Sequence, residues 1–152
     1  MNAALIVAAL LAAPVFGMAR AWMGPWAPDP TVVVLAWAAL GGARTPRMSV
    51  VVLLGVGRAL LLFEALGAQL LAACFAFLVL RAAREGLREI AGARPVFLGA
   101  LLAGLAWCAA GRLLALVLDN APLAGSELLL GALWALPFAL LKLRARRRRG
   151  WA

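Results

Sequence analysis

Residues 48–80 read MSVVVLLGVGRALLLFEALGAQLLAACFAFLVL, and the architecture of the chain follows from how this apolar run is divided. Only two of its 33 residues are charged. As one α-helix the run would be about 50 Å long, whereas the hydrocarbon core of a bilayer is about 30 Å thick. Glu64 and Gly67, near its middle, therefore indicate a tight turn. We predict two short membrane helices, Met48–Phe63 and Ala68–Leu80.

The whole chain has the composition of a membrane protein. Of its 152 residues 66% are hydrophobic and 14% are charged, and the mean hydropathy is +1.01. Soluble domains carry about a quarter charged residues and just under half apolar ones. The apolar residues form continuous runs dominated by Ala and Leu, which argues against the alternating pattern of a β-barrel. We therefore predict an all-α integral membrane protein, a compact bundle of about six short transmembrane helices.

Two apolar segments precede the central run. No Lys or Arg comes before Ala3–Met18, so we interpret it as a retained first helix and not as a signal peptide. Asp29 and Pro30 predict the start of a second helix, Thr31–Leu40, because Asp can cap free amides and Pro fits the first helical turn. This second helix is too short to cross the bilayer alone, so we expect it to lie partly inside the bundle.

Two further helices follow the central run. They are predicted at Pro95–Leu118 and Ser126–Leu141, and the amphipathic linker at residues 81–90 is expected to lie along the inner membrane surface. The six helices form one predicted transmembrane domain, residues 1–141. Residues 142–152 form a predicted basic cytoplasmic tail.

The distribution of Lys and Arg predicts the orientation. If the N-terminus is cytoplasmic, the inner segments hold all but three of the 15 basic residues. Positive charge accumulates on the cytoplasmic side of membrane proteins, so we predict a multi-pass protein with both termini in the cytoplasm.

The basic tail has two possible roles. Its cationic side chains are Lys142, Arg144, Arg146, Arg147, Arg148 and Arg149. They can anchor the topology or bind anionic lipid, which is worth about 1 kcal/mol per basic residue near the surface. The sequence pI of about 11.7 rests largely on this tail and the inner loops, so we predict no nucleic-acid partner.

Small residues recur at a spacing of four in two predicted helices. They are Ala68, Ala72 and Ala76 in one helix, and Ala100, Gly104 and Cys108 in the other. This spacing lets helix backbones approach closely in lipid, and we interpret it as packing within the chain.

The sequence offers no arrangement of residues suited to catalysis. It contains no His and no Tyr, and Cys74 and Cys108 lie inside predicted spans, where a buried thiol behaves as a small hydrophobic group. It also lacks a Gly-rich phosphate loop, a nucleophile elbow and a spaced carboxylate pair. We predict that the protein is not an enzyme and binds no metal or cofactor.

Two arginines inside the predicted spans are unusual. Arg58 precedes Glu64, and Arg112 precedes Asp119, by one and a half to two helical turns. A charge at membrane depth costs at least about 2.5 kcal/mol, so it is usually paired or functional. In one interpretation each arginine reaches the outer headgroups or pairs between helices with Glu64 or Asp119. In the other, the four side chains line an outward-facing polar cavity that holds a partner helix or an anionic group.

Four short segments in a fixed order resemble a known family. They are Pro28-Asp29 before the second helix, Arg44 and Arg47 in a basic turn, Gly55-Val56-Gly57-Arg58, and Glu64-Ala65-Leu66-Gly67. Together they resemble the MreD family of bacterial rod-shape-determining membrane proteins. The family pattern places Gly-x-x-x-Asp and Pro-Leu-Gly here; Gly57 and Leu66-Gly67 fit, whereas Ala65 replaces the proline and the Asp is missing.

The resemblance implies a non-catalytic role in the cell-wall elongation complex of the bacterial inner membrane. It implies MreC, the actin-like MreB, and RodA with its partner transpeptidase as partners. It also implies a fold similar to the substrate-binding subunits of energy-coupling-factor transporters, so a vitamin-type small-molecule-binding subunit is the alternative function. Few polar residues at membrane depth and the lack of Tyr favour the scaffold. A partner helix is then expected in a hydrophobic groove, with Arg58, Arg112 and Asp119 at its outer end.

Overall fold

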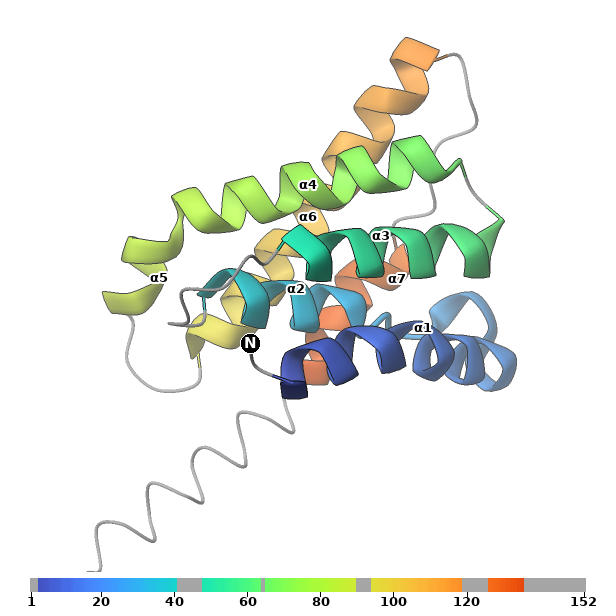
Figure 1. The fold of residues 1–152 in the computed structure, drawn as a ribbon, viewed down its shortest axis with the longest axis horizontal. Coiled ribbons are helices and arrows are strands. Elements are labelled where there is room, and N and C mark those ends of the chain that lie inside the picture. The colour runs from blue at the N-terminus through green and yellow to red at the C-terminus, as the bar shows by residue number, and fades with distance from the viewer. Residues whose placement is uncertain (1–2, 41–47, 64, 90–93, 119–125, 136–152) are drawn as a thin grey trace, which may run out of the picture.

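The computed structural model describes residues 3–40, 48–63, 65–89, 94–118 and 126–135, and the regular structure of these residues is entirely helical (Figure 1). The elements in chain order are α1 (Ala3–Met23), η1 (Gly24–Trp26), α2 (Thr31–Leu40), α3 (Met48–Leu62), α4 (Leu66–Ala82), α5 (Arg84–Glu89), α6 (Arg94–Leu118), α7 (Ser126–Leu130) and η2 (Gly131–Trp134). The prediction of an all-helical chain is confirmed over these residues. The basic tail, residues 142–152, lies outside them.

The predicted division of the central apolar run is confirmed. α3 ends at Leu62 and α4 begins at Leu66, and Phe63 between them has a left-handed backbone with φ of 54°. Few residues with a Cβ adopt this conformation, and here it marks a sharp turn. α4 begins two residues earlier than predicted, because the Ala65 carbonyl accepts the amide of Gln69 at 3.1 Å and closes a first turn.

The start of α2 is also as predicted. Oδ1 of Asp29 accepts the backbone amide of Thr31 at 2.9 Å, and the Pro30 carbonyl accepts the amides of Val33 and Val34 at 3.1 and 3.2 Å. Eight of the ten residues of α2 are buried, which confirms that this short helix lies inside the bundle. α1 contacts it, and so do α4, α6 and η2.

Two predicted boundaries need correction. α1 continues to Met23 instead of ending at Met18, and a 3₁₀ turn follows where a longer loop was expected. The last predicted helix, Ser126–Leu141, is α-helical only as far as Leu130 and then tightens into η2, while residues beyond 135 lie outside the described part. The tightening coincides with a close backbone contact at Gly131, described below.

Small residues bring the helices together, as predicted. Ala72 and Ala76 of α4 and Ala100 of α6 have no exposed surface, and α4 packs against both α3 and α6. A Cβ on Gly104 would lie 2.8 Å from the Leu128 carbonyl oxygen, so α6 and α7 are in backbone contact at this point. The interior is therefore built from Ala and Gly at helix crossings as much as from large side chains.

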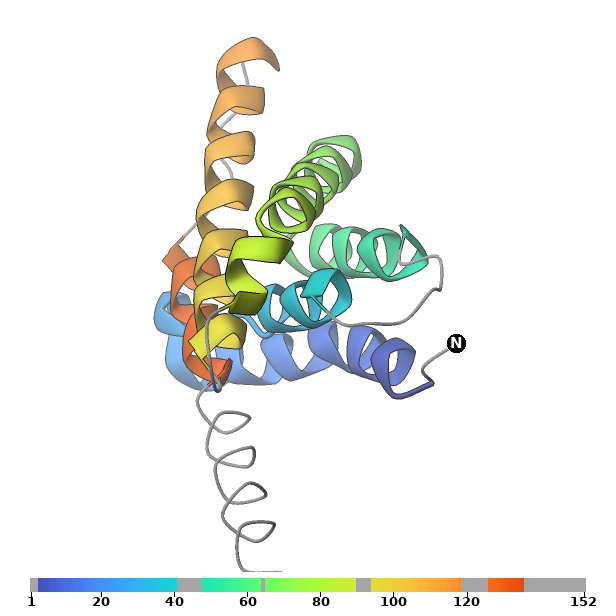
Figure 2. The same cartoon turned by 90° about the vertical axis from the view of Figure 1, so that its left-hand side faces the viewer.

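Two of the described helices are long and apolar enough to cross a membrane. They are α1, Ala3–Met23, and the part of α6 that spans Phe97–Val117. The apolar helices α2, α3 and α4 are shorter, at 10 to 17 residues. α6 runs in a different direction from α1, α3 and α4, and its C-terminal end extends beyond them (Figures 1 and 2).

Candidate functional site: a buried polar centre

Arg58 lies in the interior of the bundle. It is 1% exposed, and its Nη1 is ion-paired with Oδ2 of Asp29, whose side chain is also fully buried. The guanidinium is therefore enclosed by protein instead of reaching the outer headgroups, and the other predicted partners of Arg58, Glu64 and Asp119, lie outside the described residues. Val51 and Leu54, which precede Arg58 by two turns and one turn of α3, are buried on the same face, and this face directs Arg58 inward.

Asp29 connects the start of α2 to α3. One carboxylate oxygen, Oδ1, caps α2 through the Thr31 amide, and the other, Oδ2, meets Arg58. A carboxylate at a helix N-terminus is also favoured by the helix dipole. Sequence reasoning identified the cap but missed the ion pair, because no spacing rule relates residues that lie on different helices.

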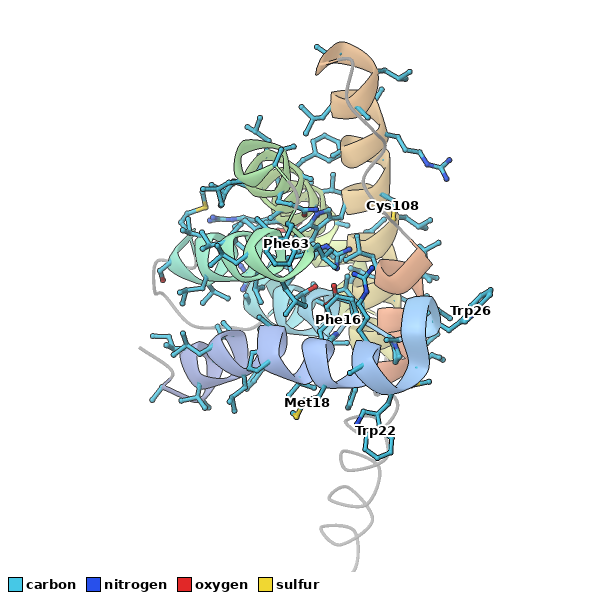
Figure 3. All side chains as sticks on the ribbon, turned by 90° about the vertical axis from the view of Figure 1, so that its right-hand side faces the viewer. Phe16, Met18, Trp22, Trp26, Phe63 and Cys108 are labelled. Carbon is cyan, nitrogen blue, oxygen red and sulfur yellow. The ribbon has the colours of Figure 1, made fainter. Side chains whose placement is uncertain are left out.

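Two aromatic rings enclose the guanidinium. Its Cζ lies 5.5 Å from the ring centroid of Phe16 on α1 and 6.0 Å from that of Trp107 on α6. Figure 3 shows Phe16 directed into the bundle, whereas Met18 and Trp22 point away from it. Cation–π contacts reach about 2 kcal/mol when they are desolvated, so both rings contribute to holding the charge in the interior.

Two tryptophan side chains extend this network to α4 and η2. Nε1 of Trp107 donates to Oε1 of Gln69 on α4 at 2.9 Å, and both side chains are buried. Nε1 of Trp134 on η2 donates to the Pro28 carbonyl at 2.8 Å. We refer to Asp29, Thr31, Arg58, Gln69 and Trp107 as the polar centre.

Gly131 lies against the backbone of the polar centre. A Cβ added there would lie 2.0 Å from the Asp29 carbonyl oxygen, a distance that no side chain tolerates. η2 can therefore approach the loop before α2 only because residue 131 has no side chain. The signal in the sequence was a single glycine inside an apolar run, and sequence reasoning missed its role.

Most polar groups of this centre bind one another, and the Thr31 hydroxyl is an exception among the described residues. Arg58 pairs with Asp29, Asp29 caps α2, and Gln69 accepts the indole of Trp107. Such an arrangement fixes the positions of four helices and the loop before α2. Over the residues that the structure describes, no group of three or more His, Cys, Asp or Glu side chains could hold a metal ion.

The other predicted site residues are not part of this centre. Arg112 is exposed on α6, whereas Arg58 is buried in the bundle. The predicted cavity would also be lined by Glu64 and Asp119, so it cannot be followed within the described residues. Cys74 and Cys108 are half-buried thiols that form no disulfide. The remaining predicted residues lie outside the described ones: Glu64, Asp119, Lys142, Arg144, Arg146, Arg147, Arg148 and Arg149.

Comparison with known proteins adds no assignment to this geometry. No protein-family model, curated protein or solved structure matches the chain. Any functional conclusion therefore rests on the layout of the sequence and on the arrangement of the described side chains.

Proposed function

We propose that this chain is a non-catalytic scaffold of the bacterial inner membrane that binds transmembrane helices of the cell-wall elongation complex. In this proposal residues 1–141 form a multi-pass bundle and both termini are cytoplasmic. Its partners are MreC and RodA with its transpeptidase, and the basic tail contacts MreB or anionic lipid. The similarity of layout to the MreD family supports the choice of complex, and the distribution of side chains supports the role of scaffold.

That distribution is the observation that carries the proposal. The buried side chains of Asp29 and Arg58 engage each other, and so do those of Gln69 and Trp107, whereas many large apolar side chains point outward. The exposed apolar residues of the long helices include Val7, Leu10 and Leu11 of α1, Val52 and Leu60 of α3, Leu71 and Leu78 of α4, and Leu105, Leu113 and Leu116 of α6. Soluble monomers rarely expose large contiguous apolar surfaces, but lipid and partner helices accept them.

The shielding of α2 supports a membrane-embedded bundle. With ten residues, α2 is about 15 Å long, half the thickness of the hydrocarbon core. Its polar N-terminus is capped by Asp29 inside the protein and its sides are covered by α1, α4 and α6. A helix this short can lie at membrane depth when protein surrounds it, because its terminal backbone groups then avoid lipid.

The alternative, a vitamin-type subunit of an energy-coupling-factor transporter, has less support. Small-molecule sites place a few polar groups around an open, mostly apolar pocket. Here the guanidinium of Arg58 lies against the rings of Phe16 and Trp107 and is paired with the Asp29 carboxylate. These groups are used for internal contacts, which favours the scaffold.

Affinity purification of the tagged full chain from native membranes in mild detergent tests the proposal. Mass spectrometry should identify MreC, RodA or the transpeptidase in the tagged sample and not in an untagged control. Recovery of paired ATPase subunits, or of a stoichiometric vitamin, would instead make the chain a transport subunit.

A further inference from the structure

The C-terminal end of α6 projects from the bundle (Figure 1), although Leu114 in this end still packs against the core. As far as Gly111, each turn of the second half of this helix contains a buried residue, including Trp107 and Ala110. From residue 112 to residue 117 no side chain is buried, and Leu116 and Val117 are 80% and 79% exposed. In Figures 1 and 2 this segment extends past α4. We call residues 112–117 the α6 arm.

The arm carries one charge among apolar side chains. Its sequence is Arg-Leu-Leu-Ala-Leu-Val, and its guanidinium belongs to Arg112. Arg112 is exposed, and no ion pair joins it to another described residue, in contrast to Arg58, which is enclosed by a carboxylate and two rings. In the membrane setting of the proposed function, such a charge is strongly unfavourable unless an anion meets it. A carboxylate matches the planar guanidinium best, because it accepts two parallel hydrogen bonds.

The exposed residues around Arg112 have the spacing of a helix interface. Five exposed residues follow one another at steps of three or four, apart from the adjacent pair at 112 and 113. They are Leu105, Ala109, Arg112, Leu113 and Leu116. Residues at this spacing form one continuous stripe along a helix. Ala109, one turn before Arg112, is small enough to let a second helix approach closely.

We propose that this stripe docks a transmembrane helix of another protein, and that an Asp or Glu of that helix pairs with Arg112. The inference rests on the proposed function and specifies the chemistry of its partner. A second copy of the chain is a poorer match over the described residues. Asp29 is buried and engaged, and Glu85 and Glu89 lie on α5, at the end of α4 away from the arm (Figure 1). Glu127 lies on α7, a five-residue helix that packs against α6 of the same chain and is too short to be a transmembrane partner. A lipid phosphate could neutralise Arg112 but gives no reason for a stripe with a small residue beside the charge.

Site-specific photocrosslinking of the full chain in native membranes tests this proposal. A benzophenone amino acid replaces Leu116 on the arm or, as a matched control, Leu10 on α1, which is 56% exposed. Light should join position 116 to a transmembrane segment that contains Asp or Glu, mapped by mass spectrometry, while position 10 should give mainly lipid adducts. Arg112→Leu should lower the protein adduct roughly three- to tenfold, and Arg112→Lys should retain most of it.

Charge exchange then separates a direct pair from an indirect effect. Arg112→Asp should abolish the adduct, and replacing the mapped carboxylate of the partner with Arg should restore it. The proposal is overturned if the protein adduct survives Arg112→Leu unchanged, if it maps to a helix without a carboxylate, or if position 116 yields only lipid. Because Arg112 is exposed, the thermal stability of Arg112→Leu in detergent should match that of the unsubstituted chain.

The outcome also distinguishes the inference from the proposed function. A carboxylate-bearing helix from a protein outside cell-wall synthesis would support the docking surface and remove the cell-wall assignment. Co-purification of cell-wall proteins together with only lipid adducts at position 116 would support the cell-wall assignment and overturn the docking surface.

Discussion

Asp29 combines a helix cap and a counter-charge, and one substitution separates the two roles. Asn at position 29 keeps an oxygen that can accept the Thr31 amide, because Asn caps helices as well as Asp does. It removes the negative charge and leaves Arg58 buried without it. We expect Asp29→Asn to lower the free energy of unfolding by about 3–5 kcal/mol.

Thermal unfolding of the purified variant in detergent measures this effect. Arg112→Leu is the control, since an exposed arginine should change stability by no more than about 0.5 kcal/mol. Equal melting temperatures for Asp29→Asn and the unsubstituted chain would show that the ion pair contributes nothing.

The effects on stability of removing the Asp29 charge and the Arg58 charge should not be additive. Arg58→Met alone leaves the Asp29 carboxylate buried without its cation, whereas Asp29→Asn with Arg58→Met removes both charges from the interior. Replacing a buried pair with neutral groups is often close to neutral for stability. The double variant should therefore be more stable than either single variant, and a loss equal to the sum of the two single losses would refute the coupling.

A substitution at Thr31 should not lower the stability of the protein, in contrast to those at Asp29 and Arg58. The Thr31 side chain is 1% exposed, and its Oγ1 has no hydrogen-bond partner among the described residues, although the backbone amide is capped. Thr31→Val keeps the shape and removes the buried hydroxyl, so it should leave stability unchanged or raise it by about 1–2 kcal/mol. A marked fall in melting temperature would show that the hydroxyl is bonded in the folded protein.

The contacts of single side chains were the hardest feature to predict from the sequence. The cap at Asp29 was predictable because it depends on neighbours in the chain. The partner of Arg58 was not, because Asp29 and Arg58 meet only after α2 and α3 pack. The buried face of α3, with Leu54 one turn before Arg58, was a signal that pointed inward, but Glu64 and Asp119 were considered as counter-charges and Asp29 was not.

Among the elements, η2 depends most directly on one residue. Gly131→Ala places a methyl group against the Asp29 carbonyl, so either η2 or the loop before α2 must shift. We expect a loss of about 1–3 kcal/mol, the usual cost of overpacking. Gly86→Ala on α5 is the matched control: a Cβ there meets nothing within 4 Å, and Ala favours the helix by up to about 1 kcal/mol.

Melting temperatures of both glycine variants in detergent decide this prediction. Gly131→Ala should melt below the unsubstituted chain and Gly86→Ala at or above it. The same melting temperature for both variants would show that the contact between Gly131 and Asp29 can relax without loss.

Helix positions were predictable where the chain itself marks the ends. α2 has the predicted bounds, and α3 and α6 differ by one residue at one end, because proline and the turn after Leu62 act locally. The change from α7 to η2 was not predictable, since it coincides with the contact between Gly131 and the loop before α2. The extension of α1 to Met23 also escaped prediction, and Pro14 is accommodated inside that helix.

At the scale of the whole molecule, a cluster of polar side chains lies in the interior and many large apolar side chains lie on the surface. The polar centre holds the helices from within, and the exposed faces of α1 and α4 carry large apolar side chains such as Leu10 and Leu71. Water penalises this arrangement and lipid accepts it. The scaffold proposal depends on it, because a partner helix within the membrane needs an apolar surface to pack against.

Spin-label accessibility in lipid vesicles tests this central point most directly. Single cysteines replace Leu10, Leu71 and the exposed Glu85 of α5 in a chain that carries Cys74→Ala and Cys108→Ala, and each is labelled with a nitroxide. Oxygen, which concentrates in lipid, should broaden the signals at positions 10 and 71 strongly, and a water-soluble nickel chelate should reach only position 85. Free access of the chelate to positions 10 and 71 would place these faces in water and contradict the account.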